Sequence, residues 1–98
     1  MHHRLPPTPP RAGLVIGARE VPAVPVHLDG HEASVVVRPG PRADERGCLR
    51  LDWDDGSSTE LDVVVRKVAG MGHVARMEVC GVTGDWRPFL EYVARTAS

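Results

Sequence analysis

The sequence predicts a mostly β fold, a small antiparallel β-barrel closed by a C-terminal amphipathic helix. Two observations support this prediction. Several short segments alternate apolar and polar residues and are separated by turn residues, which is typical of strands. Near residue 85 the apolar spacing changes from two residues to three and four, which is typical of a helix. The 98 residues suffice for one core, since two cores would each be too small to be stable.

The N-terminal segment, residues 1–12, is predicted to be a flexible, proline-rich arm in front of a single domain at 13–98. Its four prolines lack amide donors and fix φ, which favours an extended polyproline-like conformation; they are Pro6, Pro7, Pro9 and Pro10. The arm is either a simple terminal extension or a proline-rich ligand for another protein.

The first half of the domain is expected to contain three strands. Residues 14–16 form a short apolar run between glycines, which suggests an edge strand. Pro25 confines the next strand, 24–28, to an edge or a bulge. Asp29-Gly30 is expected to make a tight turn with positive φ, from which the chain returns over 33–38. The alternation of the second strand is predicted to place Val24, Val26 and Leu28 on one face.

The second half contains the clearest hairpin. Strand 49–53 alternates, residues 54–57 turn the chain, and strand 59–68 returns, followed by a strand at 74–82. The residues predicted to face inward are Leu49, Leu51, Trp53, Leu61, Val63, Val65, Met77 and Val79.

A helix is predicted at about 85–96. Asp85 is a suitable N-cap, and Pro88 falls in the first turn, where its missing N–H costs nothing. So short a helix needs support from the sheet, and Trp53 and Met77 are the expected contacts. The apolar stripe comprises Trp86, Phe89, Leu90 and Val93.

Composition argues against several function classes. The net charge of -1, with acidic and basic residues spread along the chain, gives no broad positive field for nucleic acid or membrane. No apolar run approaches the roughly 20 residues that span a bilayer. The N-terminus lacks the apolar core of a secretory signal, which favours a cytoplasmic location. Cys48 and Cys80 match no metal or redox spacing, so they are either free or, in an oxidising compartment, a disulfide.

No catalytic residues, cofactor or metal site are predicted. The five histidines are dispersed, and no Walker or dinucleotide-binding glycine loop is present. The aspartates near residue 54 are typical of a turn. Arg38 and Arg42 flank a turn and could clamp phosphates, with Asp55 and Ser57 as further polar groups. The alternative is a solvated charged loop.

The stretch 49–94 resembles the C-terminal part of bacterial PilZ domains, which are six-stranded β-barrels followed by a helix. The hairpin at Asp54-Asp55-Gly56, the strand 61–66, the turn 70–72, the strand 74–82 and the segment 89–93 carry the resemblance. It implies binding of cyclic di-GMP, a bacterial second messenger, through an RxxxR loop and a DxSxxG motif.

Two registers of these motifs fit the sequence. In one, Arg38 and Arg42 satisfy RxxxR, while Asp55 and Ser57 match DxSxxG with Glu60 in place of the glycine. In the other register, residues 19–23 align with RxxxR but lack its second arginine. Residues 42–47 then align with DxSxxG but lack its Asp and Ser.

The predicted function is therefore a non-enzymatic, PilZ-like regulatory or adaptor module that acts through protein partners, with cyclic di-GMP as the candidate ligand. The candidate interaction residues are Trp86, Phe89 and Tyr92. The alternative function is a structural or assembly subunit whose arm lies over a neighbouring copy.

Overall fold

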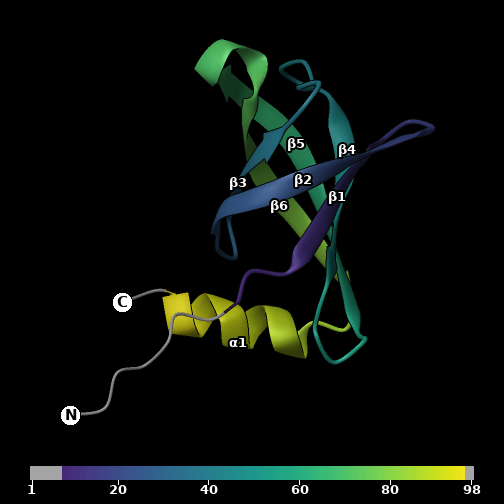
Figure 1. Ribbon diagram of the computed structural model, residues 1–98, viewed down its shortest axis with the longest axis vertical. Coiled ribbons are helices and arrows are strands. Elements are labelled where there is room, and N and C mark those ends of the chain that lie inside the picture. The colour runs from purple at the N-terminus through teal and green to yellow at the C-terminus, as the bar shows by residue number, and fades with distance from the viewer. Residues whose placement is uncertain (1–7, 97–98) are drawn as a thin grey trace.

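The computed structural model describes residues 8–96, in which six antiparallel strands close into a barrel in the order β1-β2-β3-β6-β5-β4 (Figure 1). The helix α1 crosses one end of the barrel. This confirms the predicted fold class. The elements are β1 (Arg11–Ile16), β2 (Arg19–Leu28), β3 (Glu32–Val37), β4 (Arg46–Asp52), β5 (Ser58–Ala69), a 3-10 turn η1 (Gly70–Gly72), β6 (Val74–Gly84) and α1 (Arg87–Thr96).

The barrel begins earlier than predicted. β1 starts at Arg11, inside the segment assigned to the arm, whose residues 1–7 lie outside the described part of the chain. β1 is also not an edge strand, because Leu14 pairs with Val21 of β2 on one side and with Leu49 of β4 on the other. Closure of the barrel leaves β1 without an exposed edge.

The core lies inside the barrel, and period-two alternation places its residues correctly in β4, β5 and β6. Val79 is only partly buried, and Trp53 packs against the core from just beyond β4. The inward residues confirmed as buried are Leu49, Leu51, Leu61, Val63, Val65 and Met77.

The prediction that Val24, Val26 and Leu28 of β2 share one face is wrong. Val24 and Val26 are 63% and 65% exposed, whereas Ala23 and Leu28 are buried. The register against β3 shifts between Pro25 and His27, as expected for a bulge. The extra residue at the bulge switches the face on which the preceding side chains lie. Strict alternation from Leu28 therefore places Val24 and Val26 on the wrong face.

The turn between β2 and β3 does not use a positive φ at Gly30, contrary to prediction. Its organiser is the Asp29 carboxylate, which accepts the backbone N–H groups of His31 and Glu32, both at 2.7 Å. The carboxylate also bonds His27 Nε2 at 2.8 Å. The His27 bond, and then the two backbone donors, lower the pKa of Asp29 from 3.8 to about 2.

The helix closes the barrel end where β4 ends and β5 begins. Phe89 is 1% exposed and belongs to the core, and Tyr92 and Val93 pack against that core. Trp86 and Leu90 are about half exposed, at 53% and 51%. The helix is thus rotated relative to the predicted stripe. It also begins two residues later than expected.

A buried hydroxyl links the helix entrance to the sheet. Thr59 is fully buried and accepts the Nε1–H of Trp53 at 2.8 Å. Its own hydroxyl donates to the carbonyl of Asp85, immediately before the helix. The Asp85 side chain in turn accepts the backbone N–H of Arg87 at 3.2 Å. Thr59 therefore satisfies two polar groups at once.

We expect Thr59→Val to lower the free energy of unfolding by about 1–3 kcal/mol, because it leaves two polar groups without partners while keeping the side-chain volume. Thr59→Ser keeps the hydroxyl and loses one methyl group, which should cost about 1 kcal/mol or less. Urea unfolding of both variants tests whether Thr59→Val loses more stability than Thr59→Ser. A serine variant less stable than the valine variant would show that packing, not hydrogen bonding, dominates at this position.

Candidate functional site

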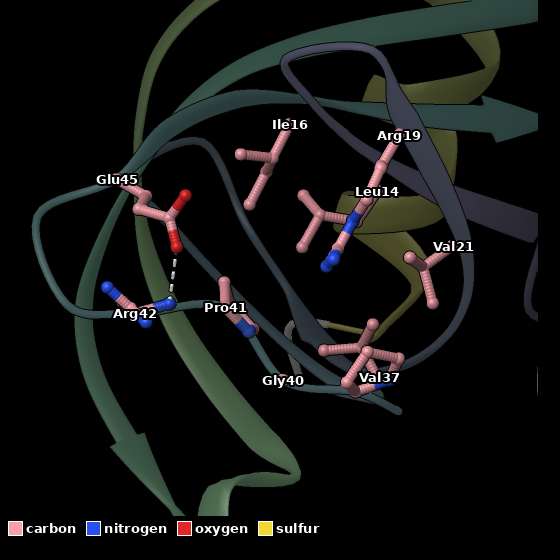
Figure 2. Close-up of a pocket in the computed structure, with 10 residues that line it drawn as sticks. Leu14, Ile16, Arg19, Val21, Val37, Gly40, Pro41, Arg42 and Glu45 are labelled. Atoms are coloured by element: carbon pink, nitrogen blue, oxygen red, sulfur yellow. Dashed lines mark hydrogen bonds between the residues drawn. The ribbon is translucent and has the colours of Figure 1, made fainter.

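A pocket of about 600 Å³ lies at the barrel end opposite α1 (Figure 2). The hairpin between β1 and β2 forms one side, and the loop between β3 and β4 forms the other. Its apolar residues are Leu14, Ile16, Val21, Val37, Pro39 and Pro41. A volume in the range of about 300–1,000 Å³ with mostly apolar walls is typical of a small-ligand site.

Local backbone geometry explains how the two sides meet. Gly17 adopts φ +61°, a left-handed conformation that lets Ile16 pair directly with Arg19. Gly47 lets β4 approach β1 closely, because a Cβ atom there would lie 2.5 Å from the carbonyl oxygen of Val15. Both glycines therefore help to place the hairpin against the β3–β4 loop.

The β3–β4 loop is held by hydrogen bonds on both sides. Within the loop, the backbone N–H of Arg42 donates to Glu45 Oε1 at 2.7 Å. Toward β5, the amide of Asp44 donates to the carbonyl of Val65 at 2.7 Å, and the amide of Val65 donates to Glu45 at 2.8 Å. The pocket wall is therefore anchored to the sheet.

Two arginines supply positive charge to the pocket. Arg19 extends over the apolar residues, and Arg42 stands at the opposite rim (Figure 2). Both side chains are exposed, and neither forms an ion pair with another residue of the range 8–96. The Glu45 carboxylate is the acidic group in the wall. Arg38 is exposed next to the pocket residue Pro39, but it does not line the pocket.

The structure does not bring the four predicted ligand residues together. Arg38 and Arg42 belong to the loop before β4, whereas Asp55 and Ser57 belong to the turn after it. A strand of seven residues spans roughly 20 Å, so β4 holds the two pairs at opposite ends of the barrel. Asp55 accepts the Ser57 hydroxyl and also its backbone N–H, the latter at 2.8 Å. These two bonds lower the pKa of Asp55 and show that the pair organises the turn.

Sequence reasoning did not recognise the combination of Arg19 with Arg42. The second motif register included Arg19 but sought its partner four residues later, at Ala23, which is buried. The second arginine that lines the pocket, Arg42, comes from a separate loop. The turn residue Gly17 was the available signal, since a tight hairpin there places Arg19 at the barrel end.

The candidate interaction residues differ in their accessibility. Phe89 is a core residue and offers no surface to a partner, which corrects its assignment. Tyr92 is partly buried, and its ring lies 5.7 Å from that of Trp53 at an interplanar angle of 53°. Trp86 is exposed, with the Arg87 guanidinium 5.7 Å from its ring centroid.

The cysteines are both free. Cys48 of β4 pairs with Asp62 of β5, which pairs with Gly81 of β6, so a whole strand lies between the two thiols. Partial burial raises the pKa of Cys48. No cluster of three or more metal-ligating side chains occurs within residues 8–96. None of the helical structure in this range is long and apolar enough to cross a membrane.

The chain was compared with protein-family models, curated proteins and solved structures, and none of them matches it.

Proposed function

We propose that this protein is a non-enzymatic, PilZ-like regulatory or adaptor module of the bacterial cytoplasm. It acts through protein contacts and binds cyclic di-GMP in the pocket lined by Arg19 and Arg42, which we call the basic pocket. The observation that carries the proposal is that Arg19 and Arg42, from separate segments, both line one pocket with largely apolar walls.

The chemistry of the pocket suits a cyclic dinucleotide. Guanidinium groups bind phosphate oxygens bidentately and stack on flat rings, while the apolar walls accept the faces of purine bases. The negative charge of the Glu45 carboxylate disfavours an anionic ligand, but one oxygen of this carboxylate accepts the backbone N–H of Arg42. Two cations against one anion leave the mouth positive.

The barrel also supports the proposal. A six-stranded barrel followed by a helix is the architecture that the resemblance to PilZ domains implies. The expected motif residues are only partly present, so the ligand would be held by Arg19 and Arg42 in place of a complete RxxxR loop.

Isothermal titration calorimetry with cyclic di-GMP tests the proposal. We expect binding that weakens about ten-fold or more in Arg19→Ala and in Arg42→Ala, because a hydrogen bond to a charged group contributes about 1.5–3 kcal/mol. Arg87→Ala, at the opposite end of the barrel, is the matched control and should bind normally. Glu45→Gln should strengthen binding, since it removes the opposing charge and keeps the acceptor for the Arg42 amide.

Two results would count against the proposal. Binding unchanged in both pocket variants would place the nucleotide elsewhere. Absence of binding, together with a concentration-dependent oligomer in light scattering that disappears when residues 1–9, which precede the barrel, are deleted, would favour the assembly subunit.

A further inference from the structure

A second groove, at the end of the barrel that α1 closes, is partly filled by the N-terminal segment of the chain itself. Pro9 and Pro10 line it together with Trp53 and Tyr92, and about 260 Å³ remains open. Pro10 is buried, whereas Pro9 is exposed. Aromatic-lined grooves are the surfaces on which domains recognise extended proline-rich segments, because such segments lose little entropy on binding.

The rim of this groove is acidic. Asp54, Asp55 and Glu91 line it, against the single basic residue Arg95. The indole N–H of Trp53 is already donated to Thr59, so the aromatic rings offer their faces and not a hydrogen bond. The complementary ligand is therefore extended, rich in proline and flanked by a basic residue. The arm has this composition, with four prolines between Arg4 and Arg11.

We infer that this groove docks an extended, proline-rich segment of a partner protein that carries a flanking arginine or lysine. The arm competes with the partner for the same surface. Because the arm joins β1 directly at Arg11, its effective concentration at the groove is of the order of millimolar. The inference does not depend on a nucleotide in the pocket at the other end.

The probe is a fluorescently labelled peptide with the sequence of residues 1–11, titrated against the full chain in anisotropy measurements. We expect the double variant Pro9→Ser/Pro10→Ser to bind the peptide at least about ten-fold more tightly than the unmodified chain, because the tethered competitor is weakened. Pro9→Ser alone, which changes an exposed residue, should shift the affinity in the same direction. A peptide with all four prolines replaced by alanine is the control and should not bind.

Two further variants locate the contact. In a Trp86→Phe background Trp53 is the single tryptophan, so its emission should change on peptide binding. Glu91→Lys should weaken binding several-fold. The inference is overturned if the alanine peptide binds equally well, or if variants that keep the β circular dichroism spectrum bind no peptide. It is also overturned if the chain self-associates in light scattering and Pro9→Ser abolishes the association, because the occupant would then be a second copy.

Discussion

Replacing Phe89 by alanine is expected to lower the free energy of unfolding by about 3–5 kcal/mol, the usual cost of removing a buried aromatic side chain. Phe89 is 1% exposed and is the buried residue of α1. It fills the barrel end that no strand covers, so its loss leaves a cavity between the helix and the core. For a small domain with a total stability of about 5–15 kcal/mol, this is a large fraction.

Leu90→Ala is the matched control, because the predicted stripe treats both residues as buried. Leu90 is 51% exposed, so we expect the free energy of unfolding to change by no more than about 0.5 kcal/mol. The slightly higher helix propensity of alanine adds a small gain in stability. Urea unfolding monitored by circular dichroism measures both variants, and Phe89→Leu provides a milder change should the alanine variant not fold. Similar losses for Phe89 and Leu90 would contradict the observed rotation of the helix.

Substituting Gly47 by alanine is the second change with a large expected effect, a loss of about 1–3 kcal/mol from overpacking. Its Cβ would lie 2.5 Å from the carbonyl oxygen of Val15 and 2.9 Å from Ile16 Cγ1. The first neighbour is backbone and cannot rotate away, so β1 and β4 must separate. Because Ile16 lines the basic pocket, the same substitution should also weaken ligand binding.

Gly30→Ala is the control for this change, since nothing lies within 4 Å of its Cβ position and its φ is not positive. We expect its thermal midpoint to remain near that of the unmodified chain. Equal destabilisation by the two substitutions would mean that lost glycine flexibility, and not the close approach of two strands, causes the effect.

The strands and the helix could be predicted because their periodicity is local. Alternation identified Leu49, Leu51 and the inward residues of β5, where the register against β4 is continuous. It failed in β2, where the shift between Pro25 and His27 depends on pairing with β3. The rotation of α1 was equally unpredictable, because which of its apolar residues turns inward depends on the shape of the barrel end.

The basic pocket could be predicted only in part. Arg42 was recognised from its own loop, but its pairing with Arg19 depends on closure of the barrel, which brings the β1–β2 hairpin to the same end. Asp55 and Ser57 were expected nearby because they follow closely in sequence. Strand β4 lies between Arg42 and these two residues and places them at opposite ends of the barrel. Their short separation in the sequence does not reveal this.

The most direct test of the basic pocket is a titration of the ¹⁵N-labelled chain with cyclic di-GMP, followed by the backbone amide signals in NMR. We predict shifts in segments 14–21 and 37–45, which form the pocket, and little change in 54–57 or in α1. Shifts centred on 54–57 and the helix, with 37–45 unchanged, would contradict a ligand site at this end of the barrel.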